Sequence, residues 1–245
     1  MSDSGVTAEY FDSEYFVWQG DLAERSARAV VPLVCDFLSP RSVVDVGCGS
    51  AAWLKVFAEN GIEDVLGIDG PHLTTASLRI PTDRYLARDL SEPFRVERVF
   101  DLAISFEAAH YIAEERAQDL VGSIGALSET VLFSAAIPNQ GGGPGLNRQW
   151  PAYWCELFAE RGLYAVDWLR PLIWEDERVD WWYAQNAILF LSEERLKALF
   201  PQGGREVLPL VHPGLFAEYA TPGPEPPPAP STRSLRQMLF GSSAS

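Results

Sequence analysis

Short β-branched runs alternate with amphipathic stretches between residues 42 and 135, and this alternation restricts the fold more than any other feature of the chain. We expect strands at residues 41–46, 64–69, 84–89, 100–105 and 130–137, with helices between them. Strands that alternate with helices at this spacing form right-handed βαβ units and a mostly parallel sheet covered on both faces. The predicted fold class is therefore α/β, with residues 164–169 and 186–191 as the last strands.

The organisation along the chain changes twice. Residues 1–40 are expected to be a helical segment that acts as a lid, ahead of a main domain at residues 41–200 that includes an aromatic-rich region at 139–183. Residues 201–245 form an extension whose stretch 221–230 is too rich in proline for a helix or strand. The chain has 245 residues, of which 47% are hydrophobic, enough for one sizeable core.

Charge and cysteine usage exclude several classes of function. A net charge of -15 argues against a nucleic-acid-binding surface and against binding to anionic membranes. Three cysteines without a CxxC pair do not indicate a disulfide framework or a zinc site, and they suit a reducing compartment. The acidic N-terminus does not resemble a signal peptide. We therefore expect a soluble cytoplasmic protein whose partner is a small molecule.

Glycines and acidic side chains follow four successive predicted strands. The carboxyl ends of the strands in an open α/β sheet lie at one edge, where ligands bind. Glycines after the first strand let the backbone approach a ligand closely, and the acidic residue after the second is placed to accept both hydroxyls of a ribose. The acidic residue after the third suits an exocyclic amine. The candidate cofactor-binding residues are Asp45, Gly47, Cys48, Gly49, Asp69, Gly70, Asp89, Leu90, Phe106 and Glu107.

Residues 47–52 also satisfy the dinucleotide-binding pattern GxGxxG/A. A dinucleotide would place a doubly negative pyrophosphate against this loop, and the carboxylate of Asp45 would repel it. S-adenosylmethionine has no phosphate, and its ammonium and sulfonium groups suit a neighbouring carboxylate. The charge of Asp45 therefore favours S-adenosylmethionine over a nicotinamide or flavin cofactor.

The stretches VVDVGCGSAAWL, GIDG, ARDL and FDLAISFEAAHYI resemble the successive motifs of class I S-adenosylmethionine-dependent methyltransferases, over about residues 40–190. The resemblance implies a Rossmann-like, seven-stranded sheet with a reversed last strand. It implies that the loop 45–49 holds the methionine moiety, Asp69 the ribose, and Asp89 with Leu90 the adenine. The stretches FSAAIPNQGG and NRQWPAYW resemble a bacterial subgroup that modifies small molecules and sugars.

One departure from the family concerns metal binding. Many relatives carry E-x-x-E-H where this chain has Glu107, His110 and Tyr111, and in some branches that set contributes to a metal site. Glu107 and His110 alone are a poor site for magnesium, which prefers oxygen ligands. We therefore predict no metal requirement.

The acceptor side offers a candidate base and several aromatic side chains. His110 follows the fourth strand and titrates near neutrality, so it is the first choice of general base, with Tyr111 second. The alternative is a histidine that is hydrogen-bonded within the following turn. Tyr15 and Trp18 are candidates for a lid over the cofactor. The candidate acceptor-binding residues, which are alternatively ordinary core, are Asn147, Trp150, Tyr153, Trp154 and Trp182.

These residues predict an enzyme that transfers the methyl group of S-adenosylmethionine to a hydroxyl or amine of a small metabolite, such as a natural-product intermediate or a sugar. The product of the cofactor would be S-adenosylhomocysteine. Two other functions remain open: a protein of this fold that binds the cofactor but catalyses a cyclisation or rearrangement, and a non-enzymatic interaction module. No residue fixes the identity of the acceptor or the atom that is methylated.

Overall fold

The computed structural model describes residues 13–71, 73, 75–141 and 145–219, with the side chains of residues 13–18 and 219 left out. The chain divides into two compact units, residues 1–212 and residues 213–245. The described part of the second unit is one short helix, α9 (Pro213–Tyr219). The proline-rich stretch 221–230 lies outside the described residues.

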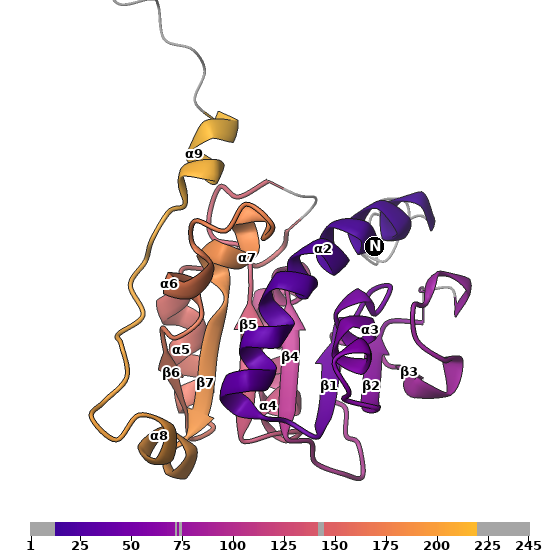
Figure 1. Ribbon diagram of the computed structural model, residues 1–245, viewed down its shortest axis with the longest axis horizontal. Coiled ribbons are helices and arrows are strands. Elements are labelled where there is room, and N and C mark those ends of the chain that lie inside the picture. Colours follow the sequence, from indigo (N-terminus) through magenta and orange to yellow (C-terminus); the bar gives the residue numbers. More distant parts are fainter. Residues whose placement is uncertain (1–12, 72, 74, 142–144, 220–245) are drawn as a thin grey trace, which may run out of the picture. The chain divides into compact units, whose positions relative to one another are not determined.

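The first unit is built on a seven-stranded sheet with the order β3-β2-β1-β4-β5-β7-β6 (Figure 1). Strands β1 to β5 run parallel, whereas β7 is antiparallel to both β5 and β6. The predicted seven-stranded sheet with a reversed last strand is therefore confirmed. The strands are β1 (Ser42–Val46), β2 (Asp64–Asp69), β3 (Tyr85–Ala87), β4 (Leu102–Phe106), β5 (Thr130–Ser134), β6 (Leu163–Val166) and β7 (Ile188–Ser192).

Helices cover both faces of this sheet, and the alternation of strand side chains shows which helices lie on which face. Val43 packs in one apolar cluster with side chains of α2 and α3, and Val44, the next residue, packs in a second cluster with α4 and α5. The helices of the unit are α2 (Ser13–Leu38), α3 (Ala52–Glu59), α4 (Ala117–Gly125), α5 (Pro151–Ala159), α6 (Arg170–Ile173), α7 (Trp181–Asn186) and α8 (Glu193–Leu199).

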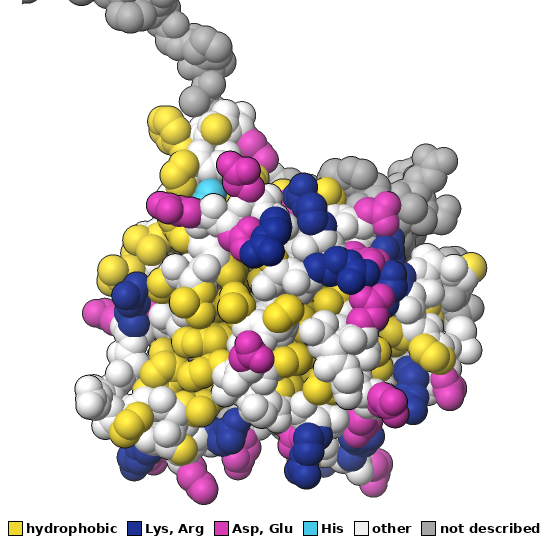
Figure 2. Space-filling model, in the orientation of Figure 1, with side chains coloured by type: hydrophobic (Ala, Val, Ile, Leu, Met, Phe, Trp, Pro, Cys, Tyr) yellow, Lys and Arg dark blue, Asp and Glu magenta, His cyan; other side chains and the backbone are white. Residues whose placement is uncertain are grey.

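Helix α2 is part of the core from Ala23 onward, because its small and β-branched side chains pack in the same cluster as α3. Glu24 on α2 forms ion pairs with Lys55 of α3 and with Arg79. Figure 2 shows acidic and basic side chains interleaved on this face of the molecule. The predicted lid depends on Tyr15 and Trp18, whose side chains lie outside the described residues. None of the described helices is long and apolar enough to cross a membrane.

Candidate active site

The carboxyl ends of the parallel strands and the amino end of the antiparallel strand β7 meet at one edge of the sheet. The register pairs Val46 with Ile68, Phe106 with Ser134, and Phe133 with Ile188. The segments that follow β1, β2, β4 and β5 therefore lie at the same edge as the segment that precedes β7. The predicted cofactor residues of the first, second and fourth strands all reach this edge.

The loop after β1 is shaped by glycines that no other residue could replace without strain. Gly47 has a φ of +79° and Gly49 a φ of +51°. A Cβ atom on Gly47 would lie 2.2 Å from the Cβ atom of Ala108, which follows β4. The thiol of Cys48 packs against Gly67 of β2, so any contact between Cys48 and a cofactor would come from its backbone. The loop thus exposes backbone at the point where a ligand is expected.

Asp69 ties this loop to the end of β2. One of its carboxylate oxygens accepts a hydrogen bond from the N–H of Gly49 at 2.7 Å, and the other from the N–H of Gly70 at 2.6 Å. Buried Asp45 lies near enough that burial, and then the charge of Asp69, raise the pKa of the Asp45 carboxyl well above its usual range. A cation bound between these carboxyls would offset both costs. The residues therefore fit the positively charged cofactor that the sequence predicts.

The remaining predicted cofactor residues differ in their surroundings. The Leu90 side chain lies close to Gly47, whereas Asp89 is exposed and accepts hydrogen bonds from the N–H and hydroxyl of Ser91 at 2.9 and 2.6 Å. The ring of Phe106 packs 4.5 Å from the ring of Trp53, so a cofactor contact by Phe106 would come from its backbone. The roles assigned to Asp89, Leu90 and Phe106 stay predictions.

Glu107 is the first residue after β4 and occupies the left-handed region of backbone conformation, with a φ of 54°. Its N–H donates to the carbonyl and hydroxyl oxygens of Ser134 at 2.9 and 3.1 Å. Its carboxylate accepts one hydrogen bond on each oxygen, from the amide of Asn186 and from the amide of Gln140, both at 3.0 Å. Burial raises the pKa of the Glu107 carboxyl to about 7, against the opposing effect of these hydrogen bonds.

The side-chain amides around Glu107 form a hydrogen-bond network, in which they donate to the Glu107 carboxylate or to the oxygen of another amide. The oxygen of Gln140 accepts from Asn186 at 2.9 Å, and Gln185 donates to the oxygens of both Gln140 and Asn186, at 3.3 and 3.0 Å. The side-chain oxygen of Gln185 accepts a hydrogen bond from the backbone N–H of His212 at 2.8 Å. These amides were not among the residues predicted from the sequence. The signal in the sequence is the polar pair Gln185 and Asn186, which precedes the apolar run of β7.

The structure argues against His110 as the general base. The side chain is 3% exposed, and its Nδ1 atom accepts a hydrogen bond from the backbone N–H of Ala136 at 3.2 Å. Burial, and then the charge of Arg148, lower its pKa to about 3. A neutral ring whose Nδ1 lone pair is engaged carries its proton on Nε2, so it has no lone pair left for a second proton. These surroundings favour the alternative of a hydrogen-bonded structural histidine, and the role of His110 as base stays a prediction.

His110 also holds the loop that follows β5. Its carbonyl oxygen accepts hydrogen bonds from the N–H groups of Leu146 and Asn147 at 2.8 and 3.0 Å. The ring of Tyr111, the second candidate base, lies against the His110 ring with 4.2 Å between centroids. Both residues belong to a short 3-10 helix, Ala109–Tyr111, which connects the end of β4 to the acceptor side.

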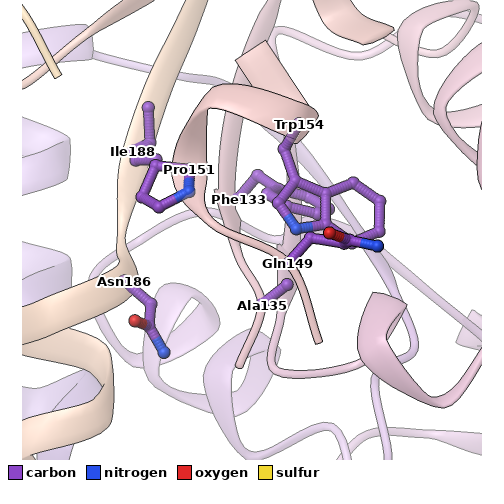
Figure 3. Close-up of a pocket in the computed structure, with 7 residues that line it drawn as sticks. All are labelled: Phe133, Ala135, Gln149, Pro151, Trp154, Asn186 and Ile188. Atoms are coloured by element: carbon purple, nitrogen blue, oxygen red, sulfur yellow. The ribbon is translucent and has the colours of Figure 1, made fainter. Parts of the chain in front are cut away.

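A small pocket opens beside this network, and it contains one of the predicted acceptor-binding residues, Trp154 (Figure 3). The indole N–H of Trp154 has no acceptor among the described residues, although the side chain is only 2% exposed. The pocket is formed by the end of β5, the start of α5 and the start of β7. Its lining residues are Phe133, Ala135, Gln149, Pro151, Trp154, Asn186 and Ile188.

The other predicted acceptor-binding residues are not gathered around this pocket. Trp150 is 43% exposed, and Tyr153 meets Trp154 edge-on at 5.0 Å. Asn147 is buried beside His110. Trp182 packs with the cluster on the opposite face of the sheet from Trp154, so the structure does not bring these two tryptophans together.

Residues 44–124 match the family model described as a methyltransferase domain. This match lies within the first unit of the chain. The match includes the loop after β1, Asp69 and Glu107, which are the residues that the edge of the sheet brings together. Among the residues that the structure describes, no group of three or more histidine, cysteine or acidic side chains is placed to hold a metal ion. The absence of a metal requirement stays a prediction.

Solved methyltransferase structures share the fold of this chain at low sequence identity. A candidate O-methyltransferase from Nostoc punctiforme is 14% identical with a TM-score of 0.56, over 73% of this chain and 59% of that chain. DesVI from Streptomyces venezuelae is 16% identical with a TM-score of 0.56, over 76% and 98%. CalS10, an amino pentose methyltransferase of calicheamicin biosynthesis from Micromonospora echinaspora, is 16% identical with a TM-score of 0.52, over 74% and 97%. None of the curated proteins matches the chain in sequence.

Proposed function

We propose that this protein binds S-adenosylmethionine at the carboxyl edge of its sheet and transfers the methyl group to a hydroxyl or amine of a small metabolite. The observation that carries the proposal is the methyltransferase-domain match, which spans the glycine loop, Asp69 and Glu107. The juxtaposition of these three features at one edge supports it.

The cofactor would be held by three segments of the chain. The loop 45–49 would hold the methionine moiety, Asp69 the ribose, and Asp89 with Leu90 the adenine. The raised pKa of Asp45 supports a cationic ligand, because a positive charge nearby would favour the ionised carboxyl. When bound, S-adenosylmethionine would supply a methyl group on a positively charged sulfur. The protein's part is to orient the acceptor toward that methyl group and to exclude water.

We assign the acceptor side to the region 139–183, supported by the pocket that Trp154 and Gln149 help to line. The class of acceptor, a sugar or natural-product intermediate, is supported by the likeness to CalS10, an amino pentose methyltransferase. A place in biosynthesis and secondary metabolism follows from that class. The acidic composition and the cysteines without a CxxC pair support a cytoplasmic location.

Replacing Asp69 with alanine is expected to weaken the binding of S-adenosylhomocysteine by about 1–3 kcal/mol, because hydrogen bonds to the ribose are lost. Calorimetric titration of the purified variant measures this change. Asp64→Ala is the matched control, since Asp64 begins the same strand but forms a surface ion pair with Arg98 at 2.5 Å. Equal affinity in Asp69→Ala and the wild type would refute the role of Asp69.

A panel of hydroxyl- and amine-bearing small molecules tests the transfer reaction itself. S-adenosylhomocysteine released in step with a methylated product would support the proposal. A product formed without S-adenosylhomocysteine would favour a cyclisation or rearrangement, in which the cofactor is not consumed. A protein with no affinity for either form of the cofactor would favour an interaction module.

A further inference from the structure

Glu107 lies between the glycine loop after β1 and the pocket that contains Trp154. Ala108, the next residue, packs onto Gly47 of the glycine loop, so Glu107 adjoins the region where the cofactor is expected. On its other side, the amide of Asn186 donates to the Glu107 carboxylate and also lines the pocket with Trp154. Glu107 is therefore linked to the glycine loop through Ala108 and to the pocket through Asn186.

The hydrogen bonds around Glu107 suit a carboxylate that receives one more proton donor. Each carboxylate oxygen offers two acceptor positions, and each accepts one side-chain hydrogen bond, from Asn186 or from Gln140. The amide of Gln185 donates to Gln140 and Asn186, which fixes the direction of both amides. Glu107 is partly exposed, so a ligand can approach it.

Two ionisable groups that are close to Glu107 in space or in sequence carry no charge near neutrality. Burial raises the pKa of the Tyr183 phenol on α7 above its ordinary value, with the Glu107 charge contributing. The pKa of His110, which follows on the same segment, is lowered to about 3, first by burial and then by the charge of Arg148. The Glu107 carboxyl has a pKa of about 7, so both its protonated and ionised forms are present at physiological pH.

We propose that Glu107 is the proton acceptor of the transfer reaction and that Gln140 and Asn186 are its positioning residues. The inference rests on the proposed function. The acceptor is then a hydroxyl or an alkylammonium group, since only a nucleophile that carries a removable proton needs such a base. The acceptor's oxygen or nitrogen forms the bond to the methyl carbon, the electron pair of the broken carbon–sulfur bond stays on sulfur, and the proton passes to a carboxylate oxygen of Glu107.

The first test needs no acceptor. The full chain is labelled with ¹³C at the glutamate carboxyls, and the Glu107 resonance is identified by its loss in Glu107→Gln. We expect it to titrate near pH 7 in the free protein, and its midpoint to fall by about one pH unit or more with saturating S-adenosylmethionine. S-adenosylhomocysteine, whose sulfur carries no positive charge, should leave the midpoint higher than S-adenosylmethionine does.

The outcomes of this titration separate the two proposals. A midpoint that is the same with both bound cofactors would place Glu107 away from the reacting sulfur and overturn its role as proton acceptor, with cofactor binding intact. Failure of both cofactors to bind would instead refute the proposed function, and the inference with it.

The second test uses the acceptor found in the panel. Glu107→Gln is expected to lower kcat by about 10²–10⁴-fold and to leave the dissociation constant of S-adenosylhomocysteine unchanged. The kcat of the wild type should rise with pH around the lowered midpoint that Glu107 shows with S-adenosylmethionine bound, and Asn186→Ala should move that midpoint upward because a donor to the carboxylate is removed. Gln118→Ala is the matched control, because it removes a hydrogen bond from a side-chain amide to the carboxylate of the surface residue Glu160. This variant should not change the midpoint. Retained kcat would overturn the role of Glu107 as proton acceptor. Retained kcat at saturation together with lost cofactor affinity would show that Glu107 is a cofactor anchor instead.

Discussion

Replacing Arg170 with methionine is expected to lower the free energy of unfolding by about 3–5 kcal/mol, because it would leave the buried carboxylate of Asp167 without a partner. Arg170 is 1% exposed and forms two parallel hydrogen bonds to Asp167, at 2.8 and 2.6 Å. Its remaining nitrogen donates to the carbonyl oxygens of Gln185 and Leu208. Urea-induced unfolding of the purified variant measures the loss.

Arg178 provides the matched control for this prediction. It also pairs with an aspartate, Asp176, at 2.6 Å, but its side chain is 73% exposed. Arg178→Met should therefore change stability by less than about 1 kcal/mol. The double variant Arg170→Met, Asp167→Leu should recover part of the loss, since no buried charge remains. A loss in Arg170→Met no larger than that in Arg178→Met would contradict the importance of the buried pair.

The loss of Arg170 is also expected to reach the active site. Gln185, whose carbonyl oxygen Arg170 binds, donates to the two amides that hold Glu107. The Glu107 carboxyl should therefore titrate at a higher pH in Arg170→Met than in Arg178→Met, provided that both variants remain folded under the conditions of the titration. This readout separates the support of the site from general stability.

Replacing Gly47 with alanine is expected to cost about 2–5 kcal/mol of stability and to abolish measurable binding of S-adenosylhomocysteine. A φ of +79° alone costs a residue with a side chain about 1–2 kcal/mol. The added Cβ atom would also lie 2.2 Å from the Cβ atom of Ala108, and overpacking of this kind costs about 1–3 kcal/mol. To relieve the clash, the glycine loop and the segment that carries Glu107 must move apart.

Gly61 separates these two contributions. Its φ is +91°, but a Cβ atom there would meet nothing within 4 Å. Gly61→Ala should therefore show only the backbone cost of about 1–2 kcal/mol and bind S-adenosylhomocysteine as the wild type does. Equal losses of stability in the two variants, with cofactor binding kept in both, would contradict a close approach of the two loops at Gly47.

The strands and helices could be predicted because each has a hydrophobic pattern within its own residues. The run that contains Val43 and Val44 is buried on both faces, as a parallel strand flanked by helices must be, and its period predicted β1. Gly47 and Asp69 were brought together correctly because parallel strands end at the same edge. The reversed direction of β7 came from the family resemblance, since no periodicity records strand direction.

The surroundings of Glu107 could not be predicted in the same way. Gln140, Gln185 and Asn186 meet through the antiparallel direction of β7 and the turn after β5, and an amide in a loop has no pattern that reveals its partner. His110 was chosen as base from its ordinary titration range, which assumes contact with solvent. Its burial and its hydrogen bond from the N–H of Ala136 depend on tertiary packing, and they favour the structural alternative.

Calorimetric titration of the wild-type protein with S-adenosylmethionine, S-adenosylhomocysteine and NADH tests the central claim most directly. We predict micromolar binding of the first two ligands and none of NADH, because a cation would relieve the repulsion between the carboxyls of Asp45 and Asp69, whereas a pyrophosphate would add negative charge beside them. No binding of either adenosyl compound, or a preference for NADH, would contradict the claim that this edge of the sheet is a methyl-donor site.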